Sequence, residues 1–249
     1  MSASKTQIDR LGERLKTGTV TDEDLEILDE FRRSHAGAYA EIIRRVRDYL
    51  DVAPTGRPAK STTSIIDKLQ RERLRLTQMQ DIAGCRLVVS DSYLQSAVAE
   101  SLMNHLESDG IKRTMVDRRE SPSHGYRAVH IVASWLDKHV EIQIRTELQH
   151  LWSELSEKLS DIFDHRIKYG GGAIEIQTIL LQASRLVSAH ETKENEFGSF
   201  LNSFSSDHEM ATNMREIARR KVELENQRTA LLDGFGKMVK AMIVEGESE

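Results

Sequence analysis

The chain has 249 residues, of which 39% are hydrophobic and 30% are charged, a composition typical of a soluble, helix-rich protein. Its formal net charge of −5 argues against broad, nonspecific affinity for nucleic acids. No apolar run approaches the ~18 residues of a membrane span, and the polar N-terminus lacks a signal-peptide core, so we expect a cytoplasmic protein that does not bind membranes.

The first 55 residues are predicted to form a helical N-terminal segment. Thr21, followed by the acidic residues 22–24, is typical of a helix that begins with a hydroxyl N-cap and a negatively charged first turn. We expect this helix to continue to about Tyr49. A linker should end it, because two prolines and a glycine follow: Pro54, Gly56 and Pro58.

A basic segment with several hydroxyl side chains covers residues 57–68. A second helix is predicted to begin near Ser61 or Thr62. That start places Ser64 and Lys68 one turn apart on the same helix face, where both can reach a phosphate chain. The basic character continues at Arg71, Arg73 and Arg75.

An apolar strand is predicted at residues 85–89. Asp81 and Arg86 flank Gly84, and a glycine at a strand entrance permits close approach of a backbone or a ligand. Cys85 is the single cysteine, which forbids an internal disulfide, and we expect it to be a small core residue. The nine scattered histidines and the absence of paired Cys or His spacings argue against zinc.

Strands and helices then alternate. We predict a helix over residues 92–106 and strands over 112–116, 127–134 and 139–145, with a hairpin turn at 136–138 between the last two. This order predicts an α/β fold with a mixed sheet.

The last of these strands carries an alternating pattern. It should bury one set of side chains and present Glu141, Gln143 and Arg145 together at one surface. Alternation alone is typical of a plain solvated sheet face. Two carboxylates, Asp81 and Glu141, together with clustered cations instead indicate a site for a metal ion and phosphate.

The remaining chain is predicted to be helical. A helix beginning near Glu147 has an apolar stripe, and Trp152 beside it is expected in the core rather than at a ligand. The glycines of 169–172 favour a hinge over a phosphate cradle. Helices are predicted over about 174–187, which is rich in aliphatic residues, and over about 206–244. The second carries apolar residues that must pack against a partner surface: Leu224, Leu231, Leu232, Phe235, Met238, Val239 and Met242.

On the motifs around Asp81, Tyr126 and Glu141, the chain resembles the synthetase domain of the RelA/SpoT family in its small, stand-alone form, over roughly residues 40–170. That family transfers pyrophosphate from ATP to the ribose 3′-hydroxyl of GDP or GTP, which makes (p)ppGpp alarmones. The resemblance implies a nucleotidyltransferase-like fold with a mixed sheet flanked by helices. We expect an N-terminal helical segment at 1–55, a synthetase core at 56–170 and a helical extension at 171–249.

The resemblance also implies a role for each matching residue. Asp81 is the primary ligand of Mg²⁺, and Glu141 is a second ligand or the base that accepts the 3′-hydroxyl proton. The ATP side comprises Arg57, Lys60, Ser64 and Lys68 at the phosphates, and Arg86 against the adenine. The acceptor side comprises Tyr126, which stacks on the base, and the polar residues His130, Gln143 and Arg145.

Three departures from the family pattern fall near these positions. The lysine that often precedes the Gly-Tyr pair, where it would grip the acceptor's 5′ phosphates, is replaced by Ser123 and His124. No histidine follows Trp152 in the next turn, and Pro58 stands where an arginine is usual, with Arg57 one residue too far back.

The missing lysine keeps an alternative open. A branch of the family comprises toxins that pyrophosphorylate the 3′ end of transfer RNA, or that make adenosine alarmones. An inactive nucleotide sensor or RNA-binding module is a third possibility. Hydrolysis of alarmones is not expected, because the chain has no His-Asp pair. The C-terminal helices pack on the core, mediate the self-association common among small synthetases, or bind a regulatory or antitoxin protein.

Overall fold

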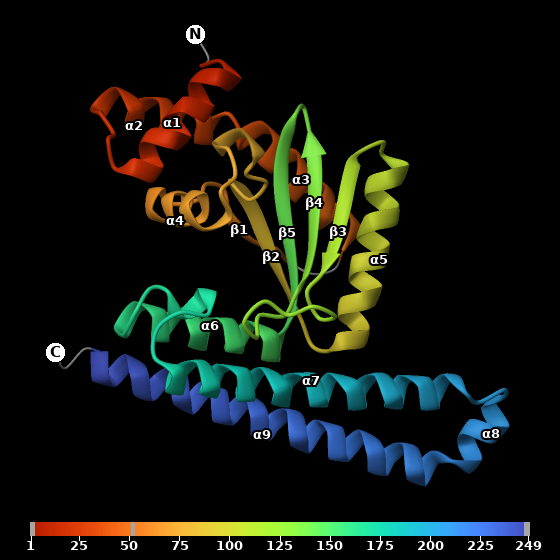
Figure 1. Ribbon diagram of the computed structural model, residues 1–249. Coiled ribbons are helices and arrows are strands. Elements are labelled where there is room, and N and C mark those ends of the chain that lie inside the picture. The colour runs from red at the N-terminus through yellow and green to blue at the C-terminus, as the bar shows by residue number, and fades with distance from the viewer. Residues whose placement is uncertain (1–2, 51–52, 247–249) are drawn as a thin grey trace. The chain divides into compact units, whose positions relative to one another are not determined.

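The computed structural model describes residues 3–50 and 53–246 (Figure 1). Its contacts divide the chain into two compact units. The first comprises residues 1–87, 100–116 and 130–143, and the second comprises residues 88–99, 117–129 and 144–249. None of the helices in the described part of the chain combines the length and apolar character that a membrane crossing needs.

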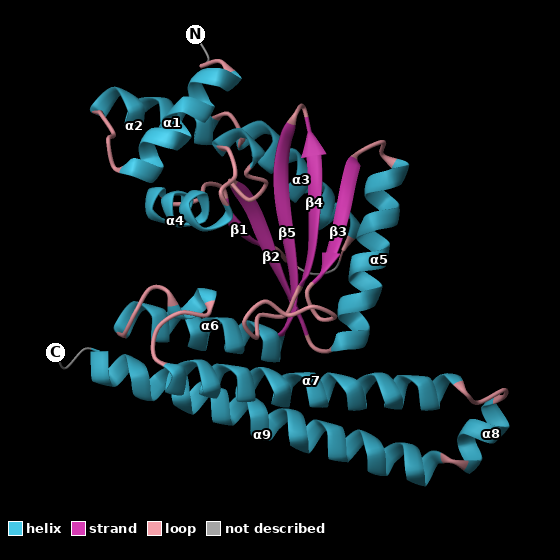
Figure 2. Cartoon of the chain, in the orientation of Figure 1, coloured by secondary structure: helices cyan, strands magenta, loops and turns pink. Residues whose placement is uncertain are grey.

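A five-stranded sheet forms the centre of the first unit, in the order β1-β2-β5-β4-β3 (Figure 2). The strands are β1 (Thr55–Arg57), β2 (Ala83–Val89), β3 (Lys112–Asp117), β4 (Val129–Trp135) and β5 (Lys138–Thr146). Helices flank the sheet, so the expected fold, a mixed sheet with helical extensions, is confirmed. The short β1, which pairs antiparallel with β2, lies where only a linker was predicted.

The helices before the sheet are α1 (Lys5–Thr17), α2 (Asp22–Arg33) and α3 (Ala36–Tyr49). Thr21 caps α2 as predicted. The single helix expected from Thr21 to Tyr49 is wrong, because Ser34 and His35 interrupt it. The Ser34 hydroxyl donates to the carbonyl of Phe31 at 2.6 Å, and His35 Nδ1 lies 2.9 Å from the same oxygen, so side chains compete with the helical hydrogen bonds.

The N-terminal helices help to fix the basic segment. Helix α4 (Thr62–Glu72) begins where predicted and is capped by Ser61, and its Ile65 and Leu69 are fully buried. They pack with α1 and α2 in one hydrophobic cluster: Ile8, Leu11, Leu15, Leu28, Phe31, Leu76, Met79 and Ile82. Because that cluster holds one face of α4, the adjacent face, which carries Ser64 and Lys68, is fixed as well.

In the β4–β5 hairpin, the alternation predicted for β5 is confirmed up to Ile144: Val140, Ile142 and Ile144 are fully buried, whereas Glu141 and Gln143 are partly exposed. The prediction is wrong for Arg145, which is buried rather than presented at the surface. Leu136 and Asp137 form the two-residue turn with φ values of 48° and 59°, and such a pair of left-handed residues matches the twist of a tight hairpin.

Helices dominate the second unit: α6 (Glu147–Ile162), α7 (Ile174–Asn202), α8 (Asp207–Thr212) and α9 (Met214–Gly246). Helix α5 (Ser92–Ser108) begins in this unit. The last helix was predicted as one piece over 206–244 but is divided at Asn213, whose side-chain amide donates to the carbonyl of Glu209 at 2.9 Å.

Helices α6, α7 and α9 share a hydrophobic cluster that contains Trp152, which is 4% exposed and therefore in the core as predicted. From α9, Phe235 is buried in this cluster, and Leu231 and Leu232 pack against it. Part of the C-terminal apolar surface is thus covered within the chain. The side chains of Val239 and Met242 lie outside the described residues.

Candidate active site

Asp81 lies just before β2, between two lysines. Its Oδ2 is 2.8 Å from Lys60 Nζ, and its Oδ1 is 3.0 Å from Lys68 Nζ. Burial would raise the pKa of Asp81, but the two ammonium groups outweigh burial and lower the pKa to about 2. Burial lowers the pKa of Lys60 despite the attraction of Asp81. The carboxylate is therefore ionised at neutral pH.

Backbone contacts fix the loop that brings Lys60 to Asp81. The Lys60 amide donates to the carbonyl of Ile82 at 2.8 Å. Arg57 Nη2 donates to the carbonyl of Asp81 at 3.0 Å. Arg57 therefore reaches the entrance of β2 although it lies one residue before the family position.

Glu141 on β5 is held by two neighbours. Its Oε1 lies 3.0 Å from His130 Nδ1 on β4, and its Oε2 accepts from Gln143 Nε2 at 2.7 Å. Burial would raise the pKa of Glu141, and so does the charge of Asp81, but His130 and Gln143 outweigh them and lower the pKa to about 2. We call Lys60, Lys68, Asp81, His130, Glu141 and Gln143 the carboxylate cluster.

Gly84 allows β2 and β5 to approach each other within this cluster. A Cβ atom at Gly84 would lie 2.5 Å from the carbonyl oxygen of Glu141, closer than carbon and oxygen can pack. The close approach expected at this glycine is therefore confirmed, and the group that approaches is the backbone of β5. Cys85, the next residue, is buried as predicted, and burial raises its pKa to about 12.

The other two ATP-side residues lie on the same elements. Arg86 is half-buried on β2, opposite Thr55 of β1. Ser64 lies in the first turn of α4, where its hydroxyl accepts from Ser61 Oγ at 2.9 Å. Their roles in nucleotide binding stay predictions.

The donor groups of the carboxylate cluster fit a hard cation. Mg²⁺ is usually held by one or two protein carboxylates, with phosphate and water supplying the remaining oxygens. Asp81 and Glu141 are both ionised and act on each other electrostatically. Within the described residues, three or more potential ligand side chains do not gather at any one point, so a site held by protein groups alone is not supported there.

Two predicted acceptor-side residues, Tyr126 and Arg145, belong to the second unit and contact each other. Arg145 Nη2 donates to the Tyr126 hydroxyl at 3.1 Å, and the guanidinium carbon lies 5.1 Å from the centre of the tyrosine ring. The ring of Trp152 lies 6.5 Å from that of Tyr126. We call these three residues the Tyr126 cluster. Arg145 is only 4% exposed, so it differs from the partly exposed Glu141 and Gln143 that precede it on β5.

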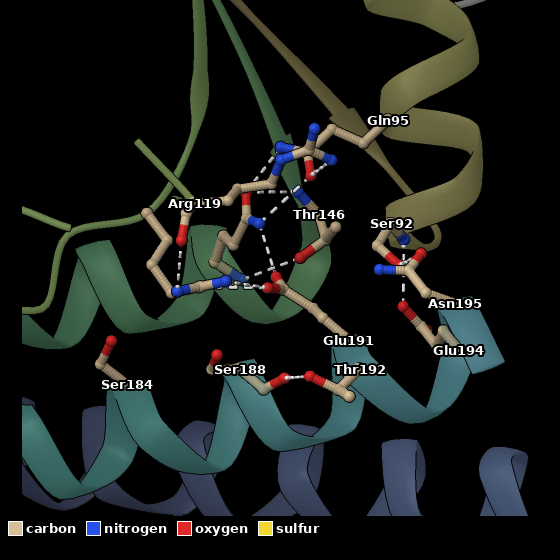
Figure 3. Close-up of polar contacts among 12 residues, drawn as sticks. Ser92, Gln95, Arg119, Thr146, Ser184, Ser188, Glu191, Thr192, Glu194 and Asn195 are labelled. Carbon is tan, nitrogen blue, oxygen red and sulfur yellow. Dashed lines mark hydrogen bonds and ion pairs between the residues drawn. The ribbon is translucent and has the colours of Figure 1, made fainter. Parts of the chain in front are cut away.

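Sequence reasoning missed a polar network in the second unit (Figure 3). Glu191 on α7 is bonded to Arg127 and to Gln149, and Gln149 is bonded in turn to Gln95. A cavity of about 230 Å³ adjoins this network. Neutral glutamines on helices carry no motif, and the only available signal was that Arg127 directly follows Tyr126.

Comparisons with known proteins agree with this architecture. Residues 56–170 match the model of a region found in RelA/SpoT proteins. The chain is 35% identical over 173 residues to an uncharacterized protein of Mycobacterium tuberculosis and, equally, to one of Mycobacterium bovis. Each match covers 67% of this chain and 62% of the relative, so the chain spans less than two thirds of these relatives.

Solved structures share the fold. The small alarmone synthetase 1 from Bacillus subtilis is 23% identical, with a TM-score of 0.52 over 74% of this chain and 100% of that one. The structure of the same protein bound to its product pppGpp is 24% identical in sequence, with a TM-score of 0.53 over 73% of this chain and 100% of that one. A GTP pyrophosphokinase family protein from Streptococcus pneumoniae is 22% identical, with a TM-score of 0.53 over 73% and 96%.

Proposed function

We propose that the chain is an ATP-dependent pyrophosphokinase of the RelA/SpoT type, since its residues 56–170 match a region found in RelA/SpoT proteins. The β,γ-pyrophosphoryl group of ATP is transferred to the ribose 3′-hydroxyl of GDP or GTP, and the product is a (p)ppGpp alarmone. The 3′-hydroxyl releases its proton as its oxygen forms a bond to the β-phosphorus, the bond from that phosphorus to the oxygen shared with the α-phosphorus breaks, and AMP leaves with that oxygen.

The observation that carries the proposal is the carboxylate cluster. Two lysines hold Asp81 ionised, and β5 presents a second ionised carboxylate, Glu141, within its electrostatic reach. Transfer of this kind depends mainly on positioning and on neutralising charge along the phosphates. Lys60 and Lys68 face the Asp81 carboxylate in this structure. If a cation bound with ATP took their place at that carboxylate, both ammonium groups could turn to the phosphate oxygens.

Asp81 and Glu141 would hold Mg²⁺, which neutralises phosphate charge when it is bound. The low pKa of Glu141 favours this ligand role over the role of general base, because an effective base has a pKa near the working pH. His130, 3.0 Å from Glu141, orients that carboxylate from the neighbouring strand.

One observation favours a second acceptor class. The residue before Gly125 and Tyr126 is His124, whose φ is 52°. Its imidazole packs so closely on Gly170 that a Cβ atom at position 170 would meet the ring. No lysine stands at this position to grip 5′ phosphates. An acceptor without a 5′ triphosphate, such as the 3′ end of transfer RNA, suits such a loop.

The test is a transfer assay with γ-labelled ATP and Mg²⁺. GDP, GTP, GMP, ADP, ATP and deacylated transfer RNA serve as acceptors in parallel reactions. We expect label on GDP and GTP. Label on transfer RNA or on an adenosine nucleotide alone would replace the acceptor and keep the reaction type, whereas label on none of them, with nucleotide binding intact, would favour an inactive sensor.

A further inference from the structure

Helix α7 binds the loop that carries Tyr126 on both sides of that residue. Ser184 Oγ donates to the carbonyl of Gly125 at 2.7 Å. Glu191 Oε2 accepts from Arg127 Nη2 at 2.7 Å and from Arg127 Nε at 3.1 Å. Ser184 and Glu191 are two helical turns apart, so they lie on one face of α7 (Figure 3). They are only 6% and 4% exposed.

The second oxygen of Glu191 is linked through one intermediary, Gln149, to the residue that follows Arg145. Oε1 accepts from Gln149 Nε2 at 2.5 Å. Gln149 Oε1 accepts from the backbone amide of Thr146 at 3.2 Å, directly after Arg145. A single buried carboxylate thus fixes the residue after Tyr126 and the residue after Arg145.

Gly125 packs closely against both Trp152 of α6 and Ser184 of α7. Its φ is 90°, and a Cβ there would lie 2.8 Å from Trp152 Cζ2 and 3.2 Å from Ser184 Cβ. The loop is therefore pressed between α6 and α7. A displacement of α7 towards the loop would therefore push on Gly125.

We infer that Ser184 and Glu191 of α7 are positioning residues that fix Tyr126 and Arg145 for the acceptor nucleotide. This inference rests on the proposed function and deepens it, because it makes acceptor binding depend on a helix outside residues 56–170. We call Ser184, Glu191 and their partners Gly125, Arg127 and Gln149 the α7 clamp. Both positioning residues act through protein groups, so their loss would loosen Tyr126 and Arg145 without removing a direct contact to the acceptor.

The kinetic test uses the full chain with Glu191→Gln, Glu191→Ala and Ser184→Ala. Glu191→Ala leaves Arg127 buried without its carboxylate and can impair folding, so the milder two variants keep the test decisive. Glu196→Ala is the matched control, because Glu196 is an exposed glutamate on the same helix. With GDP as acceptor, we expect the KM for GDP to rise about tenfold in Glu191→Gln, with the KM for ATP changed less than twofold. A fall in kcat alone, with both KM values unchanged, would indicate a merely structural role and overturn the inference.

Hydrogen exchange supplies a readout that needs no activity. We expect faster amide exchange in residues 119–129 for the Ser184 and Glu191 variants and unchanged exchange for Glu196→Ala. Unchanged exchange in all variants would overturn the clamp itself. A wild-type protein that transfers to no acceptor would overturn the proposed function and the acceptor role, and the exchange data would still decide whether α7 holds the loop.

Discussion

The carboxylate cluster of the first unit and the Tyr126 cluster of the second differ in the forces that organise them. In the first, two ionised carboxylates dominate: two ammonium groups surround Asp81, and the imidazole of His130 faces Glu141. In the second, a tyrosine ring lies against a guanidinium and an indole, and the surrounding hydrogen bonds join the Glu191 carboxylate to Arg127 and to the neutral amide of Gln149. Charged groups suit a reaction step in which the charge of the phosphates must be neutralised, and an aromatic surface suits recognition of a base. The difference predicts that substitutions in the first cluster change turnover and those in the second change the KM of the acceptor.

The largest effect is expected from Asp81→Asn and Glu141→Gln. Each keeps the shape of the side chain and removes its charge, so kcat should fall by about a hundredfold to a thousandfold. The affinity for ATP, measured by calorimetry, should change far less, since Lys60 and Lys68 remain. Asp29→Asn, which changes an exposed carboxylate of the same unit, is the control and should retain wild-type turnover. Wild-type kcat in both cluster variants would rule out the metal-centred mechanism.

Tyr126→Ala should have the next largest effect and should act on the other parameter. Base stacking contributes about 1–3 kcal/mol, so the KM of the acceptor should rise by roughly fivefold to a hundredfold, while the KM of ATP should hold. Tyr126→Phe keeps the ring and loses only the hydroxyl that accepts from Arg145, so its effect should be smaller. Initial rates over a matrix of both substrates separate the two constants. Equal losses for both variants would show that the hydroxyl matters rather than the ring.

Gly84→Ala tests how closely the strands of the carboxylate cluster must approach. The new methyl group would meet the backbone carbonyl of Glu141, which cannot rotate away as a side chain could. We expect a loss of about 1–3 kcal/mol in the free energy of unfolding, measured with urea, from overpacking. Gly37→Ala is a useful control because nothing lies within 4 Å of a Cβ at that helical position. Equal stability of Gly84→Ala and the wild type would mean that β2 and β5 can separate at no cost.

The features predictable from sequence were those with a local signature. A glycine between two charged residues, Asp81 and Arg86, marked the entrance of β2, and alternation marked β5, so the positions of Gly84 and Glu141 on these strands were predicted. The helix break at Ser34 was not predicted, because it depends on two side chains that contact one backbone carbonyl. The apolar pattern of the helix continues across the break. Glu191 escaped for a different reason. Its partners lie 42 and 64 residues away, and no periodicity links α7 to the loop that it holds.

Acid should weaken the carboxylate cluster selectively, and this is the smallest effect expected. The folded pKa of Asp81, about 2, is below its ordinary value of 3.8, so its ion pairs stabilise the fold above pH 3.8 and lose that contribution as the pH falls towards 2. The difference in unfolding free energy between wild type and Asp81→Asn should therefore be about 2 kcal/mol at pH 6 and should vanish near pH 2. Urea titrations at pH 6, 4, 3 and 2.5 measure it. A difference that stays constant over this range would mean that Asp81 stabilises the fold through hydrogen bonds that its neutral form also makes, and the contrast between a charged and an aromatic cluster would then lose its electrostatic basis.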